Sequence, residues 1–530
     1  MTDNQSRERN FSAKVTTTAS WDPRAWMNLK STVGADYVNQ ENDFANTNGT
    51  TLPPGASTVS SASIRDASQR QPTAVKTLGL YVQEQAGFRD RLFVTGAIRT
   101  DQNSAFGTNF QQVYYPKLSV SWILSDESFF PRYSWLNQFR FRSAYGASGV
   151  QPRPTDALVT YSPGTVALTG RTDSKEQDVS GLTASQPGNA NLKPERSAEL
   201  ESGFDAQLLN NRVHFEYTFW TKQTSDALVQ VSLSPSSAAS QLTPLLNVAS
   251  TKGWGHEAQI NAQLLQRRNF GWDVLVSGSH FSNKVVDLGS VSSTCTLPSG
   301  PTVACLIVNS GSTSGQAREI AGHPIFEQWY RPYTYKDENG DGILQRSEVH
   351  VDPNFASFGY RVPRDIISVV NGFDLFNRRL RVQALFDYKG GNSILDGANN
   401  FQCNTSPFAC RDTQDPNAPL DRQAAAIAKT YGTTVGGVNY KSSAGYFVSD
   451  QFWKFREFSA TLQLPKLVTD RLRASNGSTV VFGARNLHTW SSWTGIDPEA
   501  NYGTTQTEAQ NEFQTTGAPT YFTLRLNLKY

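Results

Sequence analysis

The chain has 530 residues, a net charge of +2 at pH 7, 18% charged residues and 11% aromatic residues. A charge this close to zero gives no indication of nucleic acid as a partner. No apolar run approaches the roughly 18 residues that a membrane helix requires, so any membrane-spanning segment has to be built from strands. The first ten residues are polar and charged, and they contain no apolar core of a secretory signal peptide.

Alternating apolar and polar residues predict antiparallel strands along most of the chain. The clearest hairpin joins residues 198–209 to residues 212–222 across Asn210 and Asn211. Two stretches rich in Asn, Ser, Thr and Gly, residues 39–77 and 148–196, are predicted to be long loops. A short helix is predicted at residues 421–429. About sixteen strands are expected, among them 11–21, 26–38, 80–87, 92–99, 114–124, 138–146, 255–265, 270–281, 365–376, 379–388, 452–464, 479–486 and 521–530.

The lengths of the connections are more informative than any single strand. Tight turns alternate with connections of tens of residues, so the long loops all emerge at one end of the strands. Outer-membrane barrels have short periplasmic turns and long extracellular loops, whereas a soluble sandwich or propeller has no reason to separate them. The pattern predicts an all-β fold, a transmembrane antiparallel β-barrel, with a soluble all-β protein as the alternative.

The last ten residues alternate without a fault. Such a strand suits a protein core on one side, or lipid on one side and a watery lumen on the other, and the loop pattern favours lipid. An aromatic residue at the last position also resembles the signal by which outer-membrane barrels are recognised for assembly. The apolar positions of this candidate signal are Phe522, Leu524, Leu526, Leu528 and Tyr530.

The four cysteines form two close pairs, Cys295 with Cys305 and Cys403 with Cys410. Both pairs lie in stretches with the composition of loops. The spacing favours two short-range disulfides in an oxidising compartment, with free buried thiols as the alternative. A zinc site is disfavoured because there is no Cys-x-x-Cys spacing and no nearby cluster of histidines.

Residues 337–348 (DENGDGILQRSE) fit the calcium-loop pattern D-x-[DN]-x-[DN]-G-x5-E. Calcium takes 6–8 oxygen ligands, and this spacing wraps a loop around the ion. The flanking residues do not predict helices, and the alternative is a plain acidic turn between strands. Calcium is the one cofactor predicted, with side-chain oxygens from Asp337, Asn339 and Asp341, a backbone carbonyl from Ile343 and a bidentate carboxylate from Glu348.

Several motifs occur in a fixed order along the chain. Residues 99–107 (RTDQNSAFG) are similar to R-x-D-G-S-S-x-F-G, with Gln102 in place of the usual Gly, and residues 122–129 (WILSDESF) are similar to W-x-x-S-x-E-x-F. Residues 189–195 (NANLKPE) are similar to N-P-N-L-K-P-E. As a set these motifs resemble the TonB-linked outer-membrane receptors of the SusC/RagA type. Further likeness lies at residues 141–149, 337–342, 452–465, 485–487 and 495–499.

The resemblance implies a receptor in the outer membrane of a Gram-negative bacterium that actively takes up a bulky nutrient, an oligosaccharide or a peptide. It also implies two partners, a surface lipoprotein of the SusD type and the energising TonB–ExbB–ExbD complex. Plugged outer-membrane transporters have 22 strands. Residues 1–530 are therefore expected to be the C-terminal part of such a barrel, without its plug domain and signal peptide.

Two functions from other classes stay open, a passive porin-like channel and a soluble β-rich adhesin or glycan-binding protein. The sequence contains no G-x-S-x-G, Walker or H-E-x-x-H motif, so no enzyme is predicted. The loop aromatics Trp329, Tyr330, Tyr333 and Tyr335 suit stacking on sugar rings and loop packing equally well. Other charged residues are expected to line the lumen: Arg140, Arg142, Glu199, Glu201, Arg379, Arg381 and Asp387.

Overall fold

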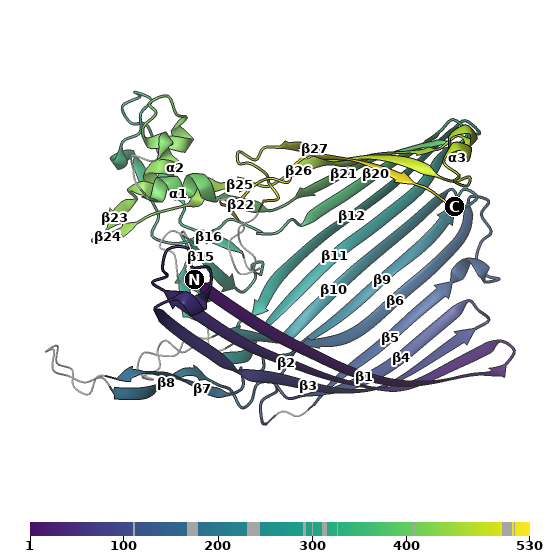
Figure 1. Cartoon of the computed structure of the whole chain (residues 1–530), viewed down its shortest axis with the longest axis horizontal. Coiled ribbons are helices and arrows are strands. Elements are labelled where there is room, and N and C mark those ends of the chain that lie inside the picture. Colours follow the sequence, from purple (N-terminus) through teal and green to yellow (C-terminus); the bar gives the residue numbers. More distant parts are fainter. Residues whose placement is uncertain are drawn as a thin grey trace. The chain divides into compact units, whose positions relative to one another are not determined.

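The computed structural model describes the whole chain apart from residues 110–111, 167–178, 231–243, 290–292, 299, 301, 310–314, 326, 406–409, 501–510 and 514. Its main feature is a sheet of fifteen strands, which follow one another in chain order (Figure 1). The strands are β1 (Thr2–Arg24), β2 (Met27–Thr50), β3 (Ile64–Phe88), β4 (Leu92–Asn103), β5 (Val113–Ile123), β6 (Leu136–Val150), β9 (Glu195–Leu208), β10 (Val213–Gln230), β11 (Leu245–Gln266), β12 (Phe270–Asp287), β20 (Asp365–Leu375), β21 (Leu380–Gly390), β26 (Phe452–Gln463), β27 (Thr479–Ser491) and β29 (Tyr521–Asn527).

The remaining strands and α-helices are short, and all but one lie in the long connections. The exception is the helix between β26 and β27, at the other end of these strands (Figure 1). One group comprises β7 (Val159–Val166), β8 (Val179–Pro187), β13 (Ser293–Thr296), β14 (Thr302–Asn309), β15 (Gly315–Ile320), β16 (Gln328–Tyr330), β17 (Tyr333–Tyr335), β18 (Val349–Val351) and β19 (Ala356–Ser357). The other comprises β22 (Ser393–Asp396), β23 (Thr433–Val435), β24 (Val438–Tyr440), β25 (Phe447–Ser449), β28 (Asn511–Glu512), and the helices α1 (Gly397–Thr405), α2 (Leu420–Thr430) and α3 (Lys466–Arg471). Among the described residues, no helix combines the length and the apolar character needed to cross a membrane.

Each of the fifteen strand stretches named from the sequence corresponds to one strand of the large sheet. The turn at Asn210 and Asn211 is confirmed, and both residues have the positive φ that tight hairpin turns require. The helix predicted at residues 421–429 is confirmed as α2. Period-two alternation was therefore sufficient to locate these strands.

The two long loops predicted at residues 39–77 and 148–196 are wrong in part. The pairing of β2 with β3 continues through Asn39↔Lys76 as far as Thr50↔Ile64. Residues 148–196 contain the hairpin of β7 and β8. These extensions are polar on both faces, so they carry no apolar alternation, but their backbone groups still pair across the strands.

The chain divides into two compact units. The first comprises Met1–Trp122, Ser143–Leu200 and Gln223–Ser250. On the polar face of its strands, Arg99 bonds to Asp36 at 2.6 Å and to Asp101 at 2.7 Å. The opposite face carries large apolar side chains that are about half exposed, such as Val82 at 54% and Ile98 at 49%. One face is thus held by ion pairs and the other is open and apolar.

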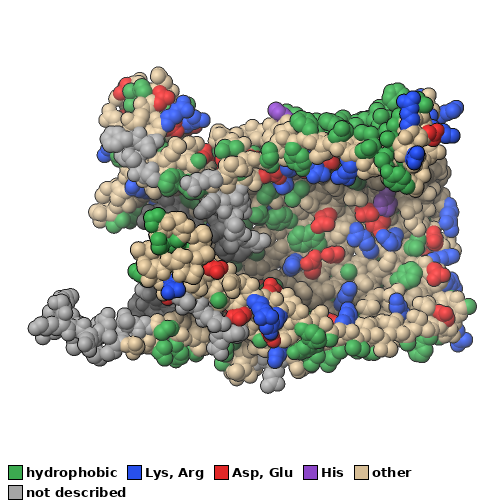
Figure 2. Space-filling view, in the orientation of Figure 1, with side chains coloured by type: hydrophobic (Ala, Val, Ile, Leu, Met, Phe, Trp, Pro, Cys, Tyr) green, Lys and Arg blue, Asp and Glu red, His purple; other side chains and the backbone are tan. Residues whose placement is uncertain are grey.

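The second unit comprises Ile123–Arg142, Glu201–Lys222 and Thr251–Tyr530. Figure 1 shows its strands β12, β20, β21, β26 and β27 side by side. On their apolar face, the rings of Phe386 and Phe455 stack at 4.6 Å. On their polar face, Arg381 bonds to Asp273 at 2.8 Å and to Asp374 at 3.1 Å. Figure 2 shows acidic and basic side chains gathered on the face of the strands turned to the viewer.

The connections of the second unit fold into small cores of their own. Ala424 and Ala428 of α2 are fully buried against Leu344, Val349 and Val351. A separate cluster surrounds the fully buried Cys305 and includes Ile320, Trp329 and Phe355. These long connections are therefore packed structures with their own apolar cores.

We expect an arginine to be tolerated on one face of β12 and not on the other. Val276 pairs with Val369 on the apolar face, and its neighbour Ser277 pairs with Ser368 on the polar face. A charge on a lipid-facing strand position costs about 2–4 kcal/mol near the bilayer midplane. Val276→Arg should reduce the free energy of unfolding by that amount, measured by urea titration of the chain in a bilayer. Ser277→Arg is the control, and equal losses in both variants would contradict the assignment of the faces.

Candidate functional site

The most highly charged site of the second unit lies where β21 and β26 meet the segment after β27. Asp387 and Lys389 project from the polar face of β21, and Lys454 pairs with Asp387 across the strands. The register shifts between Phe455 and Glu457, so Arg456 is an extra residue in a β-bulge. A bulge turns its side chain away from the regular direction, and here Arg456 reaches both Asp387 and the segment after β27.

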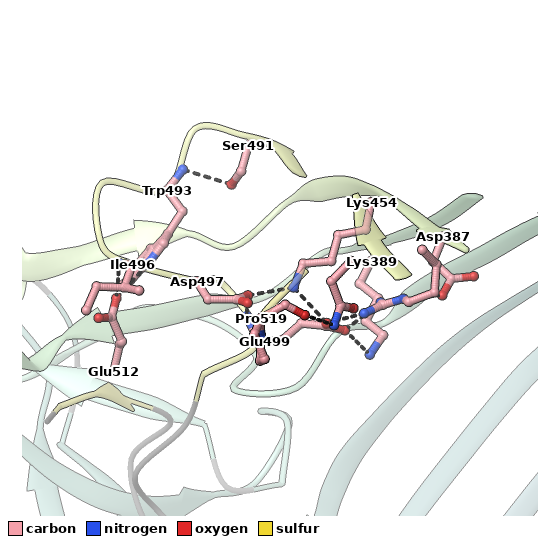
Figure 3. Close-up of polar contacts among 12 residues, drawn as sticks. Asp387, Lys389, Lys454, Ser491, Trp493, Ile496, Asp497, Glu499, Glu512 and Pro519 are labelled. Atoms are coloured by element: carbon pink, nitrogen blue, oxygen red, sulfur yellow. Dashed lines mark hydrogen bonds and ion pairs between the residues drawn. The ribbon is translucent and has the colours of Figure 1, made fainter. Parts of the chain in front are cut away.

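Glu499 is the centre of this site (Figure 3). Its two carboxylate oxygens accept hydrogen bonds from Nη1 and Nη2 of Arg456 at 2.6 and 2.9 Å. Lys389 donates at 2.7 Å and Lys454 at 2.9 Å. Burial alone would raise the pKa of Glu499, but these hydrogen bonds outweigh it and hold the pKa well below its usual range. The carboxylate is therefore ionised at every physiological pH.

The site is electrically balanced. Lys454, whose side chain is only 5% exposed, also bonds to Asp497 at 2.6 Å. Arg456 donates from Nε to Asp387 at 2.9 Å. Three cations thus meet three carboxylates, and each buried charge has partners of opposite sign, which is the condition under which buried ion pairs are stable.

A second contact fixes the same segment. Trp493 Nε1 and the backbone N–H of Ile496 both donate to Glu512 Oε2 at 2.9 Å. A Cβ atom at Gly495 would overlap that oxygen, so the close approach requires glycine. Glu512 itself lies in β28, which pairs with β22. The segment from Trp493 to Glu499 is therefore tied at two points to other elements of the unit.

Asp450 lies beside this site, in the connection between β25 and β26, and is 3% exposed. Burial raises the pKa of its carboxyl group to about 7, and the charges of Glu499 and Asp497 act in the same direction. A hydrogen bond from Asn392 Nδ2 at 3.1 Å opposes the increase. Asp450 therefore changes its charge close to neutral pH.

Glu499→Gln should destabilise the chain because three cations would lose their central anion. Removing one partner of a fully buried ion pair costs about 3–5 kcal/mol, and the loss here should be somewhat smaller because the side chain of Glu499 is 24% exposed. The measurement is the free energy of unfolding in detergent micelles. Glu457→Gln is the matched control, since its partner Arg485 is 54% exposed and such pairs contribute less than about 1 kcal/mol. Equal effects of the two substitutions would contradict a central role for Glu499.

The predicted calcium loop is an acidic turn whose acidic residues are exposed or partly exposed except for the buried Glu348, and its carboxylates bond to its own backbone. Asp337 accepts from the N–H groups of Gly340 and Gly342 at 2.7 and 2.9 Å. Both glycines have positive φ, which the sharp turn needs. Asp341 accepts from Ile343 at 2.8 Å, Asn339 bonds to Asp341, and Glu348 accepts from Glu338 and Gln345 at 2.9 and 2.6 Å.

These residues carry the oxygen ligands that calcium requires, and all of them lie within the twelve residues 337–348. Among the described residues, however, no three or more His, Cys, Asp or Glu side chains are arranged to hold a metal ion. The flanking elements are β17 and β18, so a helix–loop–helix arrangement is excluded. Calcium binding stays a prediction from the sequence.

If calcium binds, titration into the folded chain should release heat, and Asp341→Ala should remove that heat by deleting one ligand. Calorimetry at fixed pH measures this directly. Asp352→Ala is the control, because Asp352 lies in the same region, outside the predicted ligand set, and its carboxylate accepts from the N–H of Asn354. No heat with the unsubstituted chain, or the same heat with Asp341→Ala, would contradict the site.

The structure also places the four cysteines and the loop aromatics that the sequence singled out. Cys295 is bonded to Cys305, and Cys403 to Cys410, each pair within a buried cluster. Trp329 and Tyr330 are only 1% and 7% exposed, so of the two roles left open for them, stacking on sugars and loop packing, the structure supports packing. They are buried because β16 lies between β15 and β19 in a five-stranded sheet that the sequence did not predict.

The candidate assembly strand is β29, the last strand of the large sheet. It pairs with β27, and Phe522, Leu524 and Leu526 are 66%, 77% and 54% exposed. Tyr530 is 83% exposed, and Leu528 is partly exposed. An open apolar face suits lipid, and a role of these residues in assembly stays a prediction.

Four of the charges expected along the lumen form ion pairs with other residues of the polar face, whereas Arg379 is exposed in the turn before β21. Asp205 in β9 bonds to both Arg140 and Arg142 of β6. Arg381 and Asp387 take part in the pairs described above. The sequence predicted the face of these residues but not their partners. The site around Glu499 was missed, and its only signal was the motif Gly-Ile-Asp-Pro-Glu at residues 495–499.

A long antiparallel sheet with one ion-paired face, one open apolar face and long structured connections defines an outer-membrane barrel protein. The chain belongs to the family described as TonB dependent receptor-like, beta-barrel, whose model matches residues 2–409. Proteins of the SusC/RagA type are among those similar to it, and members of the family are transporters of the Gram-negative outer membrane, not enzymes.

Individual relatives are distant. TonB-dependent receptor P26 from Formosa agariphila is 25% identical over 448 residues, which cover 78% of this chain and 42% of the relative. TonB-dependent receptor SusC from Bacteroides thetaiotaomicron is 23% identical over 302 residues, covering 54% and 29%. The RagAB peptide importer in its open-open state has a similar fold, with a TM-score of 0.75, 17% identity, and coverage of 100% of this chain and 55% of that chain. The chain thus spans about half the length, or less, of the proteins it matches.

Proposed function

We propose that this chain is the barrel portion of a receptor that actively takes up a bulky nutrient, an oligosaccharide or a peptide. The observation that carries the proposal is the family match over residues 2–409. P26 and SusC are both TonB-dependent receptors, and this dependence supports active uptake. RagAB is a peptide importer, which supports a large substrate.

Two partners are part of the proposal. A surface lipoprotein of the SusD type would cover the extracellular end, and the TonB complex would supply energy. The long connections support the first partner, because α1, α2 and the small sheets form packed, folded surfaces there. Packed surfaces of this kind are suited to specific docking of another protein.

A passive porin-like channel is the second candidate. A porin keeps a water-filled lumen. Here, Glu499 and Asp497 hold their segment directly against the polar face of β21 and β26. A segment fixed on that face by buried charges favours a gated receptor over an open pore. The soluble adhesin is excluded, because the family lies in the outer membrane.

The test is uptake by cells that express the full-length gene product. Labelled oligosaccharides and labelled peptides of graded size are supplied to paired strains with and without TonB. We expect uptake of one of the two classes, and its loss when TonB is absent. Uptake by the variant Glu499→Gln should still depend on TonB if the charged site around Glu499 only stabilises the fold.

Size-limited uptake that is equal in both strains would contradict the proposal and support a porin. Swelling of liposomes that contain the purified full-length gene product distinguishes a receptor from a porin without cells. A receptor should give no swelling with small sugars, whereas an open pore should give swelling that decreases with sugar size.

A further inference from the structure

A cavity of about 340 Å³ lies at the ends of β11 and β12 that lead into the long connections. Its walls include Lys252 and Trp254 from β11, Ser282 and Lys284 from β12, and Tyr360 from the segment before β20. None of these residues belongs to the ion-paired sites of the polar face. The cavity is therefore a site distinct from those ion pairs, and its function has to be inferred from its own residues.

The lysines of this cavity lie on the apolar face of the strands. The ring of Trp254 contacts that of His280 at 5.6 Å, so the two residues share a face. Alternation places Lys252 on the same face as Trp254, and Lys284 on the same face as His280. That face of β12 continues through Val276 and is the one opposite the Asp273–Arg381 ion pair.

Trp254 indicates the position of the cavity along the membrane normal. Tryptophan is enriched where the apolar interior of a membrane meets the headgroups. Lys252 is two residues further toward the long connections, which corresponds to roughly 7 Å along a strand at about 3.3 Å per residue. Because long connections are extracellular in outer-membrane barrels, this places the ammonium groups at the headgroups of the outer leaflet.

Among the described residues, neither Lys252 nor Lys284 has an ion-pair partner. The carboxylate of Asp365, on the same face, is bonded to His280 at 2.6 Å. This contrasts with Lys389 and Lys454 on the polar face, which both bond to carboxylates.

The rest of the cavity supplies neutral polar groups. The hydroxyl groups of Ser282 and Tyr360 are 3.0 Å apart, and Tyr360 also donates to the backbone carbonyl of Asn283 at 3.2 Å. Hydroxyl groups beside two ammonium groups suit the oxygens of a phosphate ester, and the indole of Trp254 offers an apolar surface below them.

We propose that this cavity binds the phosphate-bearing headgroup of an anionic lipid from the outer leaflet. Lys252 and Lys284 bind the phosphate, and Trp254 packs against the first carbons of the acyl chains. A lipid is the occupant because the cavity opens on the apolar face, at headgroup depth. A soluble anion or a peptide has no reason to select this face.

The experiment titrates short-chain phosphatidic acid into the full chain in a neutral detergent and counts bound lipids by native mass spectrometry. Phosphatidylcholine with the same acyl chains and inorganic phosphate are titrated in parallel. Phosphatidic acid should bind more tightly than either. Lys252→Ala combined with Lys284→Ala should weaken it about 25-fold, the product of roughly fivefold for each lysine near a membrane surface.

Two further variants make the result specific. Lys252→Arg with Lys284→Arg keeps the charge and should retain binding. Lys30→Ala with Lys117→Ala removes the same charge from β2 and β5 of the first unit and should have no effect. Equal binding of phosphatidylcholine would overturn the proposal in favour of apolar adsorption. Equally tight binding of inorganic phosphate would overturn it in favour of a free-anion site.

Discussion

Backbone hydrogen bonds between neighbouring strands are the interaction on which the rest of this structure depends. Lipid offers no partner to an N–H or C=O group, and each unpaired group costs several kcal/mol in the hydrocarbon interior. In the sheet of fifteen strands, each strand between β1 and β29 pairs with a neighbour on both sides, with almost no constraint on its side chains. Among the described residues, β1 and β29 pair on one side only. Because the ladder does not depend on side chains, it can continue through the polar extensions of β2 and β3.

This ladder leaves the two faces of the sheet free to differ. On the polar face, partly buried charges lie against other strands, and an opposite charge within hydrogen-bond distance stabilises each of those named here. Arg381 meets this need with Asp273 and Asp374, and Asp205 meets it for Arg140 and Arg142. The same need for an opposite charge holds the segment after β27 in place. Its residues Glu499 and Asp497 form ion pairs with Lys389 of β21 and Lys454 of β26.

The sequence predicted the strands because alternation is local, and it failed where the decisive contacts are distant. Lys389 and Glu499 are 110 residues apart, and no periodicity connects them. The burial of Trp329 depends on β19, which follows nearly thirty residues later and is only two residues long. The strand ends were misplaced at residues 39–77 because polar pairing leaves no hydrophobic signal. Family motifs located residues 495–499, but they did not reveal that these residues provide carboxylates for an ion cluster.

The distribution of unpaired cations follows from the same electrostatics. A lysine that is buried on the polar face, such as Lys454, needs carboxylates of the protein to neutralise it. A lysine on the apolar face at membrane depth would be too costly, and one among the headgroups meets phosphates that the membrane supplies. Lys454 is 5% exposed on its side chain and binds two carboxylates, whereas Lys252 and Lys284 are exposed and flank Trp254. The buried Lys454 and the exposed Lys252 and Lys284 thus differ in what lies in front of their face of the sheet.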